Sequence, residues 1–304
     1  MEALNKVVKD LDELFSVEKL GKDPAFSRCI PQTYEPIGFA WNEFFEEKFC
    51  RLFNGLMIRG DDHVASVFLA VFPTEQVLHE FIETGQPGDL LFMHHPLHME
   101  CGDPRGKWGR GFVPVDPNLL WAMKEKGLSV YTCHLPMDYN KRIGTTEAMC
   151  EVLGAKRIGD FYSDEHGSVG AICEISELST DQLCERLKAI FEIPYVDFEG
   201  RYHDQVQTVA IVAGCGDVVD RMKEAERKGA QAYITGEIHC HIDNDYGRKR
   251  FDMMMEYAKT TTMSLIGVSH AASEYLVMKT QMKQWFEESY DLQVRLIPQH
   301  KWWL

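Results

Sequence analysis

Apolar and polar positions along the chain form a repeating pattern that predicts strands followed by helices. Four segments open with a short, β-rich apolar run, continue through small or polar residues and end in a helical pattern with charged faces. These apolar runs occupy residues 88–93, 128–132, 208–213 and 263–268. Further strands are predicted at 64–72 and 232–235, and a helix at 74–84. Strands that alternate with helices predict an α/β fold with largely parallel sheets.

The first 35 residues have a different pattern. Apolar residues recur there at the helical spacing of three and four positions: Leu4, Val7, Val8, Leu11, Leu14 and Phe15. An amphipathic helix is therefore predicted, and three prolines at positions 24, 31 and 36 interrupt the segment after it. We interpret residues 1–35 as an N-terminal extension and residues 36–304 as the main domain. The sequence contains no Gly/Ser-rich linker, so subdomains of this domain would pack without a flexible tether.

Composition and charge exclude several classes of protein. The 304 residues carry 32 Lys and Arg against 47 Asp and Glu, and this net charge of -15 is opposite to that of nucleic-acid-binding proteins. No apolar run reaches the 18 residues of a membrane span, and the N-terminus lacks the apolar core of a secretory signal. Nine cysteines without a CxxC pair indicate buried thiols in a reducing compartment. We expect a cytoplasmic protein that binds neither membrane nor nucleic acid.

Histidines and acids come directly after three of the predicted strands, in the pairs His94 and His95, His134 and Asp138, and His270 and Glu274. Functional groups of an open α/β sheet gather at the carboxyl ends of its strands. We therefore expect these side chains to form one site. Their nitrogen and oxygen atoms, without a thiolate, are ligands that suit Zn, Mn, Fe, Co or Ni.

Each pair also has its own geometric expectation. His270 and Glu274 are four residues apart and share one face if a helix begins near residue 269; the same spacing also fits a helix-end histidine with a solvated glutamate. On an extended backbone, His94 and His95 point to opposite sides, so each would serve a different ion. The alternative is one buried and one exposed histidine. Pro136 disfavours helix at the residue before it, which predicts a loop between His134 and Asp138.

Five motifs in this order resemble the Nif-three-like family of dinuclear metal proteins, often labelled GTP cyclohydrolase I type 2 homologs. They are Asn54-Gly55-Leu56, His94-His95-Pro96, His134 with Asp138, Thr235-Gly236-Glu237 with His241, and His270-Ala271-Ala272-Ser273-Glu274. The resemblance runs from about residue 36 to about residue 297. Leu135-Pro136-Met137 and Ser269 depart from it, because the family has Thr-Asn-Leu at the first place and Gly at the second.

The resemblance implies two divalent ions per chain, Zn, Fe or Mn. His95, Asp138 and Glu274 would bind one ion, and His94, His270 and Glu274 would bind the other, with Glu274 as the bridge. His134 would be a catalytic acid or base near the ions. The loop after residue 235 would lie near the site, with Glu237 as a general base. The alternative for this loop is an ordinary polar turn.

The resemblance also implies an architecture. The family fold is a three-layer α/β/α arrangement of two intertwined subdomains with the metals in a cleft. Subdomain A would comprise residues 36–150 and 255–304, and subdomain B residues 151–254, without the PII-like insertion of longer members. Family members commonly form ring-shaped hexamers, so we expect this chain to assemble with itself.

Two cations that share a carboxylate lower the pKa of a bridging water towards neutrality, and the natural chemistry is hydrolysis. A basic glycine loop at residues 103–115, with Arg105, Lys107 and Arg110, either covers the site and meets a small anionic substrate or is a solvated glycine loop. The family resemblance implies that such a substrate is nucleotide-like. The alternative is a non-catalytic metal store, chaperone or regulatory scaffold. The Gly214-Cys215-Gly216 turn is either a phosphate site or a tight turn with Asp217 as the N-cap of the next helix.

Overall fold

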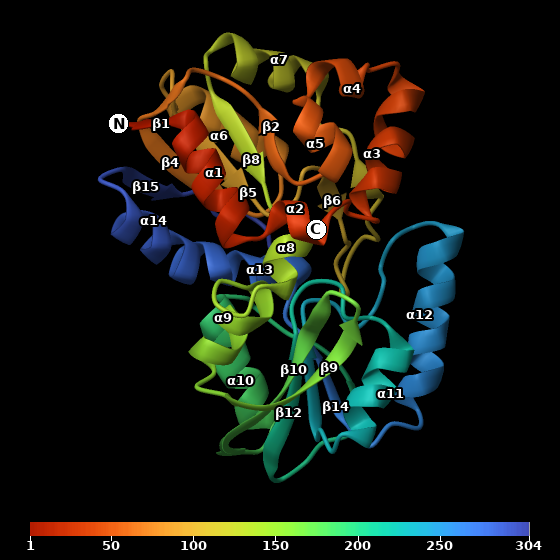
Figure 1. Cartoon of the computed structure of the whole chain (residues 1–304). Helices are drawn as coiled ribbons and strands as arrows, with labels where there is room; N and C mark the ends of the chain where they lie inside the picture. Colours follow the sequence, from red (N-terminus) through yellow and green to blue (C-terminus); the bar gives the residue numbers. More distant parts are fainter. Residues whose placement is uncertain (304) are drawn as a thin grey trace. The chain divides into compact units, whose positions relative to one another are not determined.

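The computed structural model describes residues 1–303 and has a mixed α/β fold with two main sheets (Figure 1). The chain forms two compact units. Unit 1 comprises Met1–Met99, Phe112–Asn140 and Met278–His300. Unit 2 comprises Glu100–Gly111, Lys141–Val277 and the C-terminal residues from Lys301. Within residues 1–303, the structure contains no helix that is long and apolar enough to cross a membrane.

Unit 1 contains a five-stranded sheet, and its strands in spatial order are β15 (Gln293–Leu296), β4 (Ser66–Ala70), β5 (Leu90–Met93), β8 (Ser129–Thr132) and β2 (Gly55–Ile58). The first four strands are parallel, and β2 is antiparallel to β8. Every residue of β5 and β8 is buried, as expected for central strands covered on both faces. These strands provide the rigid frame on which the chain segments after β5 and β8 are held.

Helices of unit 1 surround this sheet: α1 (Leu4–Leu14), α2 (Val17–Leu20), α3 (Phe26–Tyr34), α4 (Trp41–Phe44), α5 (Glu47–Leu52), α6 (Glu75–Thr84), α7 (Pro117–Glu125), α8 (Leu135–Tyr139) and α14 (Lys283–Ser289). A 3-10 turn (Glu35–Ile37) comes after α3, and a π-helical turn (Met278–Met282) precedes α14. β1 (Glu2–Ala3) pairs with β3 (His63–Val64). β6 (His98–Glu100) and β7 (Gly111–Val113) pair where the chain leaves and re-enters the unit.

The N-terminal residues are a structural part of unit 1. The apolar stripe of α1 is buried at Leu4, Val7 and Leu11, as the helical spacing predicts. The hydroxyl of Tyr131 in β8 donates to Asp12 over 2.8 Å. Residues 1–35, which the sequence pattern sets apart from the main domain, therefore pack directly on the sheet.

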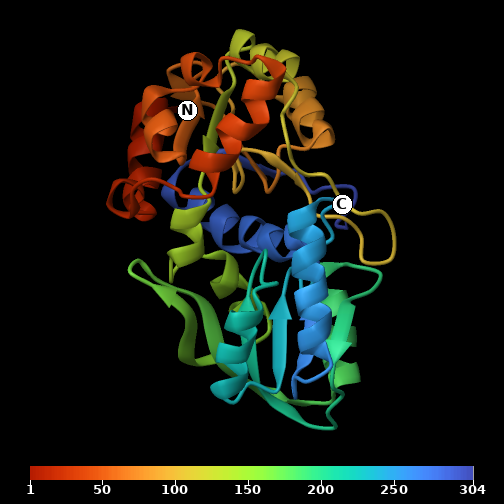
Figure 2. The ribbon, with the colours of Figure 1, turned by 90° about the vertical axis from the view of Figure 1, so that its right-hand side faces the viewer.

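Unit 2 contains a six-stranded sheet, and its strands in spatial order are β11 (Asp197–Gly200), β14 (Ser264–Gly267), β13 (Ala232–Thr235), β12 (Val206–Val212), β10 (Gly167–Leu178) and β9 (Lys156–Asp164). Its helices are α9 (Thr145–Val152), α10 (Thr180–Phe191), α11 (Val219–Arg227), α12 (Asp245–Ala258) and α13 (His270–Val277). In Figures 1 and 2, α11 and α12 cover one face of this sheet and α9 and α10 the other.

The predicted strands are present, but the prediction of largely parallel sheets is only partly right. β12, β13 and β14 are parallel, whereas β9, β10 and β11 are antiparallel to their neighbours. The reason for the β9 and β10 arrangement is the connection between them. Two residues, Glu165 and His166, join these strands, and so short a loop allows only a hairpin.

Replacement of Leu11 by Ala tests whether α1 belongs to the core of unit 1. Because the Leu11 side chain is fully buried, we expect the free energy of unfolding to fall by about 3 kcal/mol in chemical denaturation. Leu14→Ala is the matched control, since Leu14 lies on the same helix but is only half-buried. Equal effects of the two substitutions would contradict the burial of Leu11 in the core of unit 1.

Candidate metal centre

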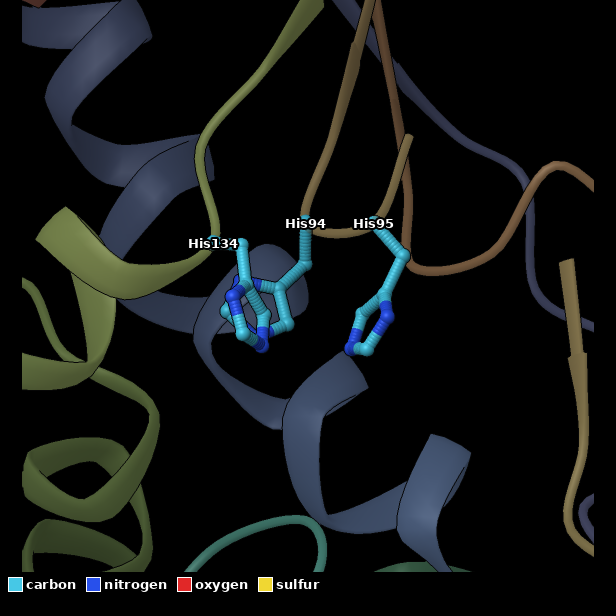
Figure 3. Close-up of side chains that lie close together, drawn as sticks. All are labelled: His94, His95 and His134. Atoms are coloured by element: carbon cyan, nitrogen blue, oxygen red, sulfur yellow. The ribbon is translucent and has the colours of Figure 1, made fainter. Parts of the chain in front are cut away.

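The end of the unit 1 sheet brings three imidazole rings together. β5 and β8 are parallel neighbours, and Met93 at the end of one pairs with Thr132 at the end of the other. The chain then delivers His94 and His95 from β5, and His134 from β8 (Figure 3). One ring nitrogen from each histidine lies within 4.8 Å of the other two. Three imidazoles at this separation form a candidate site for a divalent metal ion.

The expectation that His94 and His95 point to opposite sides is wrong. Figure 3 shows both rings on the same side of the chain, beside His134, and the two ring centres lie 4.8 Å apart. Opposite directions require an extended backbone, but β5 ends at Met93 and the chain bends at His94. The bend turns both histidines towards one location.

Hydrogen bonds fix which nitrogen of two rings is free to bind a metal or to accept a proton. His94 Nδ1 lies 2.7 Å from the carbonyl oxygen of Cys133, which can only accept, so Nδ1 carries the proton. The lone pair is then on Nε2, which lies 3.4 Å from Asp138 Oδ1. His134 Nδ1 donates to Asp23 Oδ2 over 2.7 Å, and its Nε2 lies 3.7 Å from Asp138 Oδ2. Metal-binding histidines are held in this way by an acceptor on the other ring nitrogen.

Asp23 is a site residue that the sequence does not reveal. Its carboxylate is fully buried and also accepts hydrogen bonds from the backbone N–H groups of Ala25 and Phe26. Although burial opposes the charged form, His134 and these two donors lower the pKa of Asp23 to about 2. Asp23-Pro24 has the form of a helix start, which predicts the backbone contacts. No sequence pattern predicts its contact with a ring 111 residues later.

The segment from His134 to Asp138 is helical, so the predicted loop is wrong. α8 begins at Leu135, and Pro136 lies in its first turn. A proline is compatible with this position because the first N–H groups of a helix have no partner within the helix. The backbone N–H of His134 itself donates to Asn54 Oδ1 over 2.7 Å, which holds the residue before the helix. The helix places Asp138 on the face that turns back to His94 and His134.

Unit 2 forms a second cluster in the same manner. β13 and β14 are parallel neighbours, with Thr235 paired to Gly267. The chain after β13 supplies Glu237, and the chain after β14 supplies His270 and Glu274 from α13. His270 Nδ1 lies 3.0 Å from Glu237 Oε2, and Nε2 lies 2.9 Å from Glu274 Oε1. The predicted common helix face of His270 and Glu274 is confirmed.

Electrostatics of this cluster favour a positive charge at its centre. All three side chains are buried, with 6% or less of each exposed. Burial alone would lower the pKa of His270, but Glu274 raises it well above its usual value. Without a metal, the imidazole therefore carries the positive charge that balances the carboxylates. A divalent cation would take over this role and displace the proton.

Two thiols contact this cluster, and the sequence pattern gives no indication of either contact. Cys101 Sγ lies 3.3 Å from His270 Nδ1, and Cys215 Sγ lies 3.2 Å from Glu237 Oε2. Burial raises the pKa of Cys101 to about 12, so this sulfur is protonated in the metal-free cluster. Isolated cysteines outside a CxxC pattern carry no signal of such a contact.

The glycine turn after β12 approaches the cluster closely. Gly214 has a φ of +66°, and a Cβ atom added there would lie 2.3 Å from Glu274 Oε1. Only glycine leaves room for the Glu274 carboxylate.

The prediction of Asp217 as a helix N-cap is wrong, because Val218 occupies that position and Asp217 forms a buried ion pair with Arg250 at 2.7 Å.

The basic glycine loop of unit 2 has protein partners for two of its cations. The guanidinium of Arg105 lies 4.0 Å from the ring centre of Tyr195, and Arg110 Nε donates to Glu100 over 2.7 Å. The ring of Trp303 also stacks on Tyr195, with 5.6 Å between the two ring centres. These contacts order the loop against unit 2 residues.

A family model described as Duf34/NIF3 (NGG1p interacting factor 3) matches residues 51–301. The chain belongs to this family. A protein from Pyrococcus horikoshii named GTP cyclohydrolase 1 type 2 homolog is 26% identical over 238 residues, which cover 75% of this chain and 82% of that protein. A relative of the same name from Escherichia coli is 22% identical over 252 residues, covering 80% of this chain and 88% of that one.

The fold of this chain is similar to that of solved structures. A structure described as protein ybgI of unknown function has a TM-score of 0.65 at 19% identity, over 92% of this chain and 99% of that chain. All seven candidate residues of the sequence analysis lie in the two clusters: His94, His95, His134 and Asp138 in unit 1, and Glu237, His270 and Glu274 in unit 2. These residues are the ones on which a functional proposal for this NIF3 family member rests.

The low pKa of Asp23 predicts an acid-labile contribution to stability. A folded-state pKa of about 2 against the usual 3.8 stabilises the fold above pH 4 by about 2 kcal/mol, and this contribution is lost as the pH falls towards 2. In chelator-treated protein, Asp23→Asn should lower the free energy of unfolding at pH 7. The difference in the free energy of unfolding between wild type and Asp23→Asn should become smaller as the pH falls. Asp62→Asn, at an exposed position, should neither lower the free energy of unfolding at pH 7 nor change its dependence on pH. A difference that stays constant down to pH 2 would contradict this assignment.

Ser269 has a strained backbone that predicts an unusual order of stabilities. Its φ is +73°, a region that glycine adopts without cost but that is strained for a residue with a Cβ atom. Both Ser269→Gly and Ser269→Ala lose the hydrogen bond from the hydroxyl to the Trp302 carbonyl. Only the glycine variant relieves the strain, so it should be more stable than the alanine variant by about 1 kcal/mol.

Thermal denaturation of both variants checks this order. Ser27 is the matched control, because it lies in the first turn of helix α3. There, the alanine variant should be the more stable one, since glycine disfavours helix. The same order at both positions would show that Ser269 is not strained.

Proposed function

We propose that this protein binds two divalent metal ions and is a metal-dependent hydrolase that acts on a small anionic substrate of nucleotide-like kind. The observation that carries the proposal is the unit 1 cluster. There, His94, His95 and His134 converge, and hydrogen bonds at Nδ1 direct Nε2 of two rings towards Asp138. A merely structural histidine cluster does not need this common orientation.

The donor atoms of both clusters fit such ions. His94, His95 and Asp138 provide nitrogen and oxygen ligands in unit 1, and His270 and Glu274 provide them in unit 2. This chemistry suits Zn, Fe or Mn. Membership of the NIF3 family supports the assignment of two ions, and the bridging role of Glu274 is part of this proposal.

When bound, the ions would supply a nucleophile by lowering the pKa of water towards neutrality. His134 would move the proton at its Nε2 atom, because Asp23 holds its Nδ1 and stabilises the charged ring. Glu237 would act as a second proton acceptor, and it accepts hydrogen bonds from His270 and Cys215. The buried ring of Phe26 packs against the His134 ring in a T-shaped contact, with 4.7 Å between the ring centres. This contact excludes water from one side of His134.

The substrate class and the assembly rest on wider similarity. The names of the relatives, GTP cyclohydrolase 1 type 2 homolog, support a nucleotide-like substrate. The proposal also includes a cytoplasmic, ring-shaped homohexamer with a three-layer α/β/α architecture of intertwined subdomains around a metal cleft. The helices on both faces of the unit 2 sheet support the layered part of this architecture.

Metal analysis combined with turnover tests the proposal. Protein purified without chelators should contain about two ions per chain, and Glu274→Gln should reduce this number. His134→Ala should keep the ions but lower kcat by about 100-fold or more for release of phosphate or formate from a nucleotide panel. His79→Ala is the matched control, because His79 is exposed on α6.

Three results would count against parts of the proposal. No bound metal in protein supplied with Zn, Fe and Mn would contradict the metal centre itself. Full activity in His134→Ala would contradict the role of His134. If the protein binds two ions but turns over none of the nucleotides, it is a metal store or scaffold and not a hydrolase.

A further inference from the structure

A third group of ligand side chains lies in unit 2; it shares the loop after β13 with Glu237 but includes no residue of the proposed centre. β11 supplies Asp197, and the loop after β13 supplies His239 and His241. One donor atom from each of the three lies within 4.8 Å of the other two. We propose that these three residues form an additional binding site for a divalent transition-metal ion. This inference goes beyond the function proposed above and does not depend on it.

Chain geometry explains why these donors meet. His239 and His241 are two residues apart in the loop after β13, where the chain bends at Ile238 and His239. Their ring centres lie 5.2 Å apart. Asp197 and Glu199 are likewise two residues apart on β11 and so share one face of that strand. Both acids reach His239, with Asp197 Oδ2 2.6 Å from Nδ1 and Glu199 Oε1 3.6 Å from Nε2.

The surroundings of His239 and His241 exclude bulk water from both rings, which favours metal binding. Only 4% of His239 and 7% of His241 is exposed, so neither ring relies on bulk water for its polar contacts. The ring of Phe251 on α12 lies against both histidines, with ring centres 5.0 and 5.4 Å away. Trp108 contacts His241 from another direction, with 5.5 Å between ring centres. An aromatic wall of this kind restricts the orientation of both imidazoles and excludes solvent.

The donor set defines the class of ion. Two imidazole nitrogens and one carboxylate oxygen bind Zn²⁺ or Fe²⁺ and leave at least one position open for water or another ligand. Ligands of one zinc ion lie about 3 Å apart, so the 2.6 Å contact between Asp197 and His239 requires only a small adjustment. The thioether of Met255, 3.1 Å from His239 Nε2, is a further soft neighbour.

Zinc binding to the full chain, measured against a chromophoric chelator, tests the site. His241→Asn and Asp197→Asn should each bind one zinc equivalent fewer than wild type. His203→Asn is the matched control, because His203 belongs to the same unit and its Nε2 contacts the Thr262 carbonyl at 2.8 Å. It should bind as many equivalents as wild type. Circular dichroism confirms that each variant is folded, and Asp197→Asn carries the test if the His241 variant is not.

The outcomes separate this site from the proposed metal centre. The additional site is supported if His241→Asn and Asp197→Asn each bind one zinc equivalent fewer than wild type. His94→Ala should still bind the zinc equivalent that these two variants lose. A folded Asp197→Asn variant that binds as much zinc as wild type would overturn it. If His94→Ala and Glu274→Gln lose no zinc but the cluster variants do, the proposed centre fails and the additional site remains.

Discussion

In-register pairing of parallel strands is the constraint on which both main clusters depend. Met93 pairs with Thr132 in unit 1, and Thr235 pairs with Gly267 in unit 2. Each pair ends level at one edge of its sheet, so the residues after the strands are neighbours although they are distant in the sequence. A shift of one residue in either register would turn the next side chains to the opposite face. The sheets therefore determine which histidines and acids meet.

The cost of burying charged and polar groups explains the contacts around each cluster. A buried charge is unfavourable unless it is paired and hydrogen-bonded. Asp23 meets this condition through His134 and two backbone N–H groups, and His270 meets it through Glu237 and Glu274. Both arrangements also hold imidazole rings in one orientation. The stability requirement and the orientation needed to bind a metal are thus satisfied by the same hydrogen bonds.

The sequence predicts the alternating strands and helices and the residues at the strand ends, because both depend on local periodicity. It does not predict the antiparallel strands of unit 2, since β9 and β10 pair through a two-residue hairpin without a turn motif. The direction of His94 and His95 depends on a bend after β5, and the helix after His134 depends on the tolerance of its first turn for proline. Asp23, Cys101 and Cys215 reach the clusters only through tertiary packing. Local patterns carry no information on such long-range contacts.

In the proposed centre, nitrogen and oxygen atoms bind the ions without a thiolate, although Cys101 contacts His270. X-ray absorption spectroscopy of the zinc-loaded protein identifies these ligand atoms, because Zn–N and Zn–O distances of about 2.0–2.2 Å differ from Zn–S distances of about 2.3 Å. We predict a single shell of nitrogen and oxygen neighbours that includes the multiple scattering of imidazole rings. A sulfur shell, or the absence of imidazole scattering, would contradict this claim.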